Sequence, residues 1–331
     1  MQEQQENNFS YEIISIYHQG QFSNALAINR SNTLLLVGSK KKFKIFQFKH
    51  KYLKQIQQIN KHFDNVTTLN FFQIKQWLIS GSRDNNIIIW SSNLVINSKY
   101  VIKLKSHSDW INCLVLHPLS EDLAISGSKD STIKFWCISL SSCVQTIKLF
   151  NQQIYSLSIN NIGNKLISCS DNNSILILKA LSFDQWIITQ RIVVSNFGYR
   201  LSFVKNEIFV FQPYRQSNLE IYQLNYENEK FFKITEAEIQ GGDQPCNYYF
   251  PMVYVSSKNC LLIKQGYKLN IIKIVFSTKE EIEEYKLQQV IDFKKVLWSQ
   301  IFGTMSQDGQ FLITWDFKSH LFQIREYAHK P

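Results

Sequence analysis

Histidine, serine, aspartate and tryptophan recur in the same order in two stretches of the chain. His62 precedes SGSRDNNIIIW (80–90), and His107 precedes SGSKDSTIKFW (126–136). The two blocks are offset by 46 residues, and the separations from histidine to the closing tryptophan are 28 and 29 residues. Imidazole, hydroxyl, carboxylate and indole groups can hold one another in hydrogen bonds. These two sets are therefore the first candidates for a site.

The chain lacks the local patterns that position such groups for catalysis. It contains no Gly-rich phosphate loop, no HExxH and no GxSxG, and Gly241-Gly242-Asp243 has no strand–Gly–helix context. Cys113 and His117 stand four residues apart, but one pair does not supply the four ligands that zinc prefers. We therefore expect no enzyme activity, no metal and no cofactor.

The amino-acid composition excludes several classes of protein. Of the 331 residues, 44% are apolar and 14% aromatic, while Gly and Pro number only 11 and 5. This excludes disordered and collagen-like chains. No apolar run approaches the roughly 18 residues of a membrane helix, and the start, MQEQQENNFS, is polar. Six cysteines without a CxxC pair suit free thiols in a reducing compartment. We expect an intracellular protein, cytoplasmic or nuclear, with no membrane association.

The elements that must position the two polar sets are short strands. Each block contains a strand ending in Ser-Gly-Ser, a polar turn, and a strand that closes on tryptophan, which is the pattern of a hairpin. An alternating stretch follows each histidine, VTTLNFF after the first and WINCLVL after the second. Such internal repetition predicts a repeat architecture.

These residues resemble the WD-repeat family of β-propellers, in which Gly-His is followed after a few dozen residues by Trp-Asp, one repeat per four-stranded blade. Both dipeptides are altered in this chain. Lys61 and Ser106 replace the glycine, and Ser91 and Cys137 replace the aspartate. The resemblance extends over nearly the whole chain, but only two repeats carry the specific motifs.

The resemblance also implies a structural role for the polar sets. In that family His, Ser or Thr, Asp and Trp form a buried hydrogen-bonded tetrad that braces a blade. An unpaired polar group there would cost about 1 to 3 kcal/mol. The matching tetrads are His62, Ser80 or Ser82, Asp84 and Trp90, and His107, Ser126 or Ser128, Asp130 and Trp136.

Extending the register along the chain predicts seven blades. The residues in the tryptophan position are Phe46, Trp90, Trp136, Leu178, Tyr222, Ile272 and Ile324. Trp315-Asp316 precedes the last of these and belongs near the end of the second strand of its blade. The fold expected is all-β, a single seven-bladed propeller of four-stranded antiparallel blades over residues 10–331.

The start of the chain is expected to close the ring. Too few residues follow the last tryptophan position for a fourth strand, whereas YEIISIY (11–17) has a strand pattern and stands before the first blade. In the family an N-terminal strand completes the last blade, and we expect the same closure here. Residues 1–9 would then be a flexible tail.

Candidate partner-binding residues follow from the family's crowded top face and from a net charge of +10. Arg83 and Lys129 precede the tetrad aspartates, Trp110 follows His107, and Lys40, Lys41 and Lys42 occupy a turn of the first blade. Solvated lysines without a partner are the simpler interpretation of this charge.

The fifth and sixth blades depart from the generic repeat. Arg200 stands in an inner strand of the fifth blade, where it could bind an anion or a partner carboxylate, turn outward, or pair internally. FQPYRQ (211–216) and CNYYFP (246–251) add further Tyr, Arg and Pro residues.

From the sequence we expect a non-catalytic scaffold or adaptor subunit of a multiprotein complex, with protein partners that present acidic groups. The alternative is a propeller that binds nucleic acid or another acidic surface through a basic top face. A steep salt dependence of binding would favour the alternative. The identity of the partner and the oligomeric state are left open.

Overall fold

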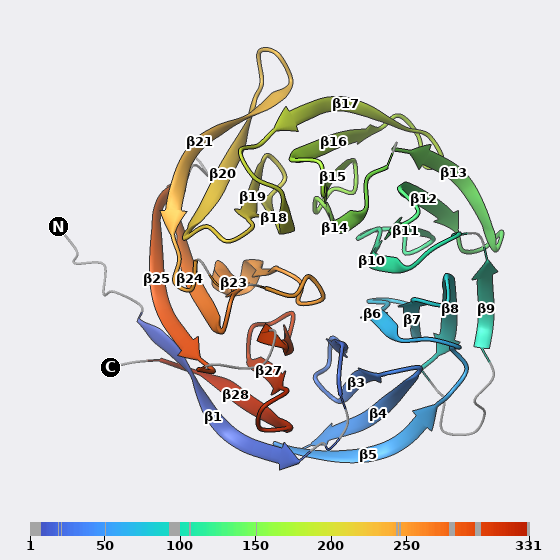
Figure 1. Ribbon diagram of the computed structural model, residues 1–331, viewed down its shortest axis with the longest axis vertical. Helices are drawn as coiled ribbons and strands as arrows, with labels where there is room; N and C mark the ends of the chain where they lie inside the picture. Colours follow the sequence, from blue (N-terminus) through green and yellow to red (C-terminus); the bar gives the residue numbers. More distant parts are fainter. Residues whose placement is uncertain are drawn as a thin grey trace.

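A computed structural model describes residues 8–18, 20, 22–49, 51–92, 100–105, 107–149, 151–242, 244, 246–277, 282–294 and 299–329. Over these residues, 28 strands form seven four-stranded sheets, in which every strand pair is antiparallel. The sheets stand as blades around a common axis (Figure 1). The predicted seven-bladed propeller is confirmed.

The strands of each blade are named a to d from the axis outward. Blades 1 to 4 comprise, in order, β2 (Ala25–Ile28), β3 (Leu34–Ser39), β4 (Lys42–Lys49), β5 (Tyr52–Ile59), β6 (Val66–Phe71), β7 (Trp77–Ser82), β8 (Asn86–Ser91), β9 (Tyr100–Lys105), β10 (Ile111–Leu116), β11 (Leu123–Ser128), β12 (Thr132–Cys137), β13 (Ser142–Lys148), β14 (Ile154–Ile159), β15 (Lys165–Ser170), β16 (Ser174–Ala180) and β17 (Trp186–Val193).

Blades 5 to 7 comprise β18 (Gly198–Lys205), β19 (Ile208–Pro213), β20 (Asn218–Asn225), β21 (Lys230–Glu238), β22 (Val253–Val255), β23 (Cys260–Gln265), β24 (Lys268–Phe276), β25 (Ile282–Asp292), β26 (Ile301–Met305), β27 (Phe311–Asp316), β28 (Leu321–His329) and β1 (Phe9–His18). A short 3-10 helix, η1 (Ser256–Lys258), joins β22 to β23. No helix in the described part of the chain is long and apolar enough to cross a membrane.

The ring is closed by the N-terminal strand, as expected. β1 pairs with β28 from Phe9 opposite His329 to His18 opposite Leu321. Phe9 is 1% exposed, so the strand begins inside the segment expected to be a tail, and residues 1–7 of that segment lie outside the described residues. The hydroxyl of buried Tyr11 donates to the carbonyl of Gly309 at 2.7 Å, which ties β1 to the turn between β26 and β27.

Apolar side chains fill the spaces between neighbouring blades, and the Ser-Gly-Ser sequences occur where two inner strands come closest. A Cβ atom on Gly81 would lie 2.9 Å from Cγ2 of Ile111, which belongs to strand a of the next blade. On Gly127 it would lie 2.5 Å from Cγ2 of Ile154. Only glycine allows blades 2, 3 and 4 to pack at this distance.

The tryptophan position of the last blade is held by Arg325, so the expectation of Ile324 was wrong by one residue. Trp90 and Trp136 each follow a bulge between strands c and d, and the corresponding bulge in blade 7 places Arg325 at that position. Ile324 packs toward blade 1 instead. The guanidinium of Arg325 donates to Oγ1 of Thr314 at 2.9 Å, in place of the indole.

Trp315 and Asp316 end β27, the second strand of blade 7, which confirms the position expected for this dipeptide.

Three glutamine side chains join the outermost strands of adjacent blades. In each case the amide oxygen accepts from a backbone N–H of the next strand d, and the amide nitrogen donates to the carbonyl of the same residue, with distances from 2.7 to 3.2 Å. We call these pairs the glutamine clasps; they join Gln145 to Trp186, Gln190 to Phe231 and Gln289 to Tyr11. The third clasp fastens the closing strand β1 to blade 6.

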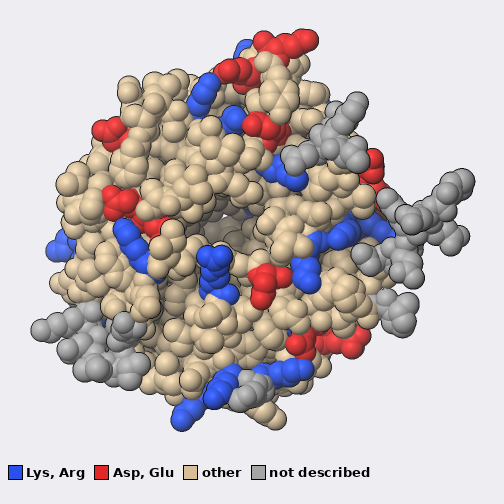
Figure 2. Space-filling view, turned by 180° about the vertical axis from the view of Figure 1, so that it is seen from behind, with Lys and Arg blue, Asp and Glu red and all other residues tan. Residues whose placement is uncertain are grey.

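The inner strands surround a central channel with a volume of about 730 Å³. Figure 2, which views the molecule from behind Figure 1, shows the hollow at the centre of the ring. Tyr155, Tyr199, Tyr248 and Tyr249 line one end of this channel. The blades therefore present a rigid ring whose channel ends are shaped by the connecting loops.

Candidate functional site

The four side chains of the blade 2 tetrad are joined in one hydrogen-bonded chain. His62 lies 2.9 Å from Asp84 (Nδ1 to Oδ2) and 2.8 Å from Ser80 (Nε2 to Oγ). The indole of Trp90 donates to the same Oγ atom at 3.0 Å. The Asp84 carboxylate accepts from Nδ1 of His62, and in the tautomer without a proton on Nε2 the Ser80 hydroxyl donates to that nitrogen. All four groups are satisfied.

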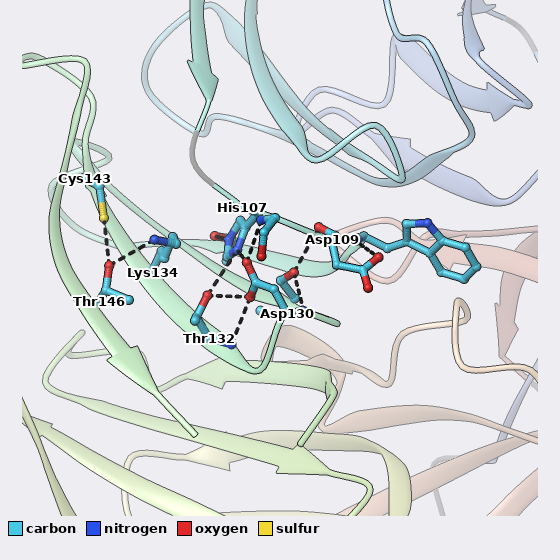
Figure 3. Close-up of polar contacts among 12 residues, drawn as sticks. His107, Asp109, Asp130, Thr132, Lys134, Cys143 and Thr146 are labelled. Carbon is cyan, nitrogen blue, oxygen red and sulfur yellow. Dashed lines mark hydrogen bonds and ion pairs between the residues drawn. The ribbon is translucent and has the colours of Figure 1, made fainter. Parts of the chain in front are cut away.

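Blade 3 repeats the arrangement with nearly the same distances. His107 lies 2.8 Å from Asp130 and 2.7 Å from Ser126, and Trp136 donates to Oγ of Ser126 at 2.8 Å. Thr132 adds a hydrogen bond to Asp130 at 2.6 Å. Figure 3 shows the side chains of His107, Asp130 and Thr132 turned toward one another.

The structure separates the two serines that the sequence left as alternatives. Ser80 and Ser126 belong to the tetrads. Ser82 and Ser128 instead donate to backbone carbonyls of the segments between blades, at 3.0 and 3.1 Å. Each Ser-Gly-Ser sequence therefore supplies one tetrad hydroxyl and one that ties down the loop before strand a.

Both tetrad carboxylates are held in the charged form. Burial alone would raise the pKa of the Asp84 carboxyl, but hydrogen bonding and charge from His62, with the backbone N–H of Phe63, hold that pKa well below its usual range. The same balance, with His107 and Thr132 as donors, lowers the pKa of Asp130. A charged carboxylate in each buried site fixes the orientation of its imidazole.

The tetrads have no route to a substrate. Ser80 and Ser126 are completely buried, and each hydroxyl oxygen already accepts a tryptophan N–H. A nucleophilic serine needs contact with the reacting atom. Among the described residues, no group of three His, Cys, Asp or Glu side chains could hold a metal ion. The tetrads therefore serve to position the loops of the top face, by which we mean the face formed by the b–c turns and the connections between blades.

One organised feature of the top face is a tryptophan ring that two cations contact. The ring of Trp110 lies 4.1 Å from the guanidinium carbon of Arg83 and 4.2 Å from Nζ of Lys129. Lys129 is also 3.5 Å from the carboxylate of Asp109. We call Arg83, Trp110 and Lys129 the tryptophan cluster. The structure thus brings together three of the predicted partner-binding residues.

Arg83 also reaches across the ring of blades. Its Nε and Nη2 atoms donate to the hydroxyl of Tyr249 at 2.9 and 2.7 Å, and that hydroxyl is 2.9 Å from the hydroxyl of Tyr248. Both tyrosines belong to the connection between blades 5 and 6, whose orange ribbon beside β23 extends toward the centre (Figure 1). The side chain of Arg83 is therefore hydrogen-bonded within the molecule, whereas the sequence suggested a residue that is free on the rim.

The three lysines of blade 1 lie apart from the tryptophan cluster. Lys40 and Lys41 are exposed in the turn between β3 and β4, and Lys42 is half-buried at the start of β4. This turn belongs to the top face, and no contact among the described residues links it to Trp110. A continuous basic surface that joins these lysines to the tryptophan cluster stays a prediction.

Arg200 does not face a partner. It is 2% exposed, its Nε donates to the carbonyl of Phe250 at 2.7 Å, and its Nη2 donates to the carbonyl of Asn247. Its position on strand a of blade 5 places the guanidinium under the connection to blade 6. Of the roles considered from the sequence, internal pairing is the one observed, and partner binding by Arg200 is corrected accordingly.

The sequence did not predict a row of contacting aromatic rings on blades 4 to 6. Tyr155 contacts Tyr199 and Tyr248, with ring centroids 4.8 and 5.3 Å apart. Tyr199 continues the row to Tyr214 at 5.1 Å, and Phe197 stacks on Tyr214 at 4.9 Å. The sequences FQPYRQ and CNYYFP carried part of this signal, but spacing alone did not show that distant loops meet.

Parts of the chain are similar to known proteins, and two repeats match a family model. Residues 53–91 and 98–137 match the family model described as "WD domain, G-beta repeat". Pre-mRNA-processing factor 19 of Bos taurus is 30% identical over 95 residues, which cover 29% of this chain and 18% of that protein. Nuclear distribution protein PAC1 of Komagataella phaffii is 29% identical over 143 residues, covering 39% and 29%.

The chain thus spans less than a third of the length of these relatives. Both matched repeats include the Ser, Asp and Trp of a tetrad, and they coincide with the blades whose hydrogen bonds are complete. The protein is a seven-bladed β-propeller that carries WD40 repeats at residues 53–91 and 98–137.

Proposed function

We propose that this propeller is a non-catalytic interaction platform that binds a protein partner through the top face of blades 2 and 3. The partner would present acidic groups around an apolar anchor. The observation that carries the proposal is the position of Trp110, which is partly exposed between the two cations of the tryptophan cluster. Aromatic and arginine side chains are the residue types that anchor protein interfaces.

The tetrads support this use of the face. Each buried histidine and aspartate fixes the loop that carries one member of the tryptophan cluster, since Arg83 and Lys129 directly precede Asp84 and Asp130. A surface whose side chains are already ordered loses little conformational entropy on binding. The rigid ring therefore favours recognition by a preformed surface.

A comparative pull-down tests the proposal. Proteins captured by the wild-type chain are identified by mass spectrometry and compared with those captured by Trp110→Ala and by Leu140→Ala. Leu140 is 70% exposed in the turn between β12 and β13, at the other end of the same blade, and provides an apolar control.

We expect Trp110→Ala to weaken partner binding by about 30-fold, the effect of losing a 2 kcal/mol anchor, while Leu140→Ala binds normally. Equal melting temperatures would show that both variants are folded. A partner retained equally by both variants would contradict the placement of the binding surface.

Binding to nucleic acid is the competing outcome. Phosphate contacts would give an affinity that falls steeply and log-linearly with salt. An apolar anchor would leave much of the affinity intact at high salt. Neutralisation of Lys129 by Asp109 reduces the positive charge next to Trp110 and supports the protein-binding alternative.

An intracellular location in the cytoplasm or nucleus remains part of this proposal. All six cysteines are free thiols in the structure, which suits a reducing compartment.

A further inference from the structure

A thiol and two cations are buried together between blades 5 and 6. Cys246, in the connection from β21 to β22, is 8% exposed; Lys264 of β23 is 0% exposed and Arg200 of β18 is 2% exposed. Nζ of Lys264 donates to Sγ of Cys246 at 3.2 Å. This group is separate from the tetrads and from the tryptophan cluster.

Burial makes the two positive charges of this group costly, and it lowers the pKa of Lys264 to about 8. Among the residues that the structure describes, no carboxylate forms an ion pair with Lys264 or Arg200. A buried ammonium is costly unless it is paired. The Cys246 thiol, which accepts a hydrogen bond from Lys264, can become an anion, and its deprotonation would balance one of the two positive charges.

The titration of the thiol agrees with this geometry. Burial alone would raise the pKa of Cys246, but the charges of Arg200 and Lys264 and the hydrogen bond from Lys264 outweigh burial and lower it to about 7. The side chain of Tyr199 also interacts electrostatically with the thiol. By contrast, burial raises the pKa of Cys169 to about 12, as it does for Cys260.

We propose that Cys246 is an oxidation site, a thiolate that reacts with hydroperoxides and is oxidised to a sulfenic acid. The thiolate sulfur attacks one peroxide oxygen, so that an S–O bond forms and the O–O bond breaks. The sulfur gives two electrons to the peroxide. The second peroxide oxygen leaves as hydroxide or alkoxide and then takes up a proton. The ammonium of Lys264 is the donor nearest to the sulfur. Thiolate character of this kind controls cysteine oxidation.

Oxidation at this position would act on the connection that reaches the channel mouth. Cys246 immediately precedes Asn247, whose carbonyl accepts a hydrogen bond from Arg200. Tyr249, whose hydroxyl accepts from Arg83, follows three residues after Cys246. An oxygen atom added to a sulfur in a tightly packed site displaces its neighbours. This inference does not depend on the proposed partner surface.

The wild-type chain tests the proposal directly. The reduced, folded protein is exposed to limiting hydrogen peroxide at pH 7.4, sulfenic acids are trapped with dimedone, and each cysteine is quantified by peptide mass spectrometry. Cys143 is the internal control because it is more exposed than Cys246. If access alone decided reactivity, Cys143 would react first.

We expect the adduct on Cys246 to exceed that on Cys143 by about tenfold, because thiolate fraction controls the rate. A native protein labelled at Cys143 and unlabelled at Cys246 would overturn the proposal. This comparison needs no variant and therefore no assumption about the folding of one.

A second measurement isolates the role of Lys264. In Lys264→Met the pH at which Cys246 labelling is half-maximal should rise by about one unit, with about fivefold less adduct at pH 7. Cys143 labelling should stay the same, and the melting temperature reports folding. An unchanged pH profile in a folded Lys264→Met protein would show that the lysine does not activate the thiol.

Discussion

Ser80 and Ser126 each connect a histidine ring to an indole through a single hydroxyl. The hydroxyl donates to the imidazole and accepts from the tryptophan, so one small side chain satisfies two larger buried ones. Removing any member leaves a buried polar group without a partner. At the scale of residues, the tetrads are therefore stabilising units.

The loss of one tetrad ring should be costly. Trp136 is 2% exposed and packs among side chains of blades 2 and 3. Trp136→Ala removes this packing and the indole donor, and we expect the free energy of unfolding to fall by about 3 to 5 kcal/mol. Denaturant unfolding measures the change. A loss below about 1 kcal/mol would contradict a bracing role for the tetrad.

The tetrad carboxylates predict a loss of stability in acid. The pKa values of Asp84 and Asp130 are lower in the folded chain than in the unfolded chain, so the unfolded chain binds more protons as the pH falls below about 4. Their contribution is present above that pH and is lost as the pH falls toward the folded values. Unfolding measured between pH 6 and pH 2 should show this fall. In the double variant Asp84→Asn/Asp130→Asn, the free energy of unfolding should fall less over this pH range. An equal fall in the variant and the wild type would show that other groups cause it.

Arg325 shows why one residue of the repeat was misplaced from the sequence. Ile324 continues the apolar alternation of its strand, whereas an arginine normally indicates a solvent-facing position. The bulge opposite Arg325 turns that side chain inward, where burial lowers its pKa to about 10 and Asp316 opposes the change. The hydrogen bond to Thr314 replaces the one that an indole would donate. An arginine at the tryptophan position of a blade can therefore be identified only from the structure.

At the scale of elements, β1 is the strand on which ring closure depends. It pairs with β28 along its whole length and receives the clasp from Gln289. Without β1, strand c of blade 7 and the facing side of blade 6 would be open, and uncovered sheet edges are prone to association. Closure is a property of this strand together with its glutamine clasp.

Deletion of residues 1–18 should therefore destabilise the whole ring, with a melting temperature lowered by about 10 °C or more, corresponding to several kcal/mol. Deletion of residues 1–8 is the matched control, since it leaves every residue of the β1–β28 ladder in place. Differential scanning calorimetry compares the two proteins with the full chain. A normal melting temperature after the longer deletion would contradict closure by β1.

The elements themselves were largely predictable, and the loops were not. Alternating apolar residues and the Ser-Gly-Ser hairpins are local signals, so blade number and the closing strand followed from them. The contact between Arg83 and Tyr249 joins residues far apart in the chain, and the burial of Arg200 depends on where that same loop lies. Such contacts are set by the assembled ring and leave no local pattern.

At the scale of the whole molecule, the positive charge is distributed rather than concentrated. The net charge is +10, and the lysines of blade 1 and the tryptophan cluster belong to different blades of the ring. Exposed charges of this kind act mainly on the rate of encounter with an acidic partner. Their effect on the fold should be small.

Replacing Lys40, Lys41 and Lys42 with Glu should slow association with an identified partner and reduce its salt dependence, while the melting temperature stays within a few degrees of wild type. Trp110→Ala should instead increase the dissociation rate. Surface plasmon resonance over a salt series separates the two effects. An unchanged association rate in the triple variant would show that these lysines are only solvated.

The pairing of Phe9 with His329 places the two ends of the folded chain next to each other, at the same end of the β1–β28 ladder. Figure 1 shows β1 and β28 side by side at the edge of the ring. A force that pulls these ends apart would load the hydrogen bonds of the ladder one after another, from Phe9 inward. Tension applied between Phe9 and His329 would therefore peel β1 from β28 and open the ring at its last blade.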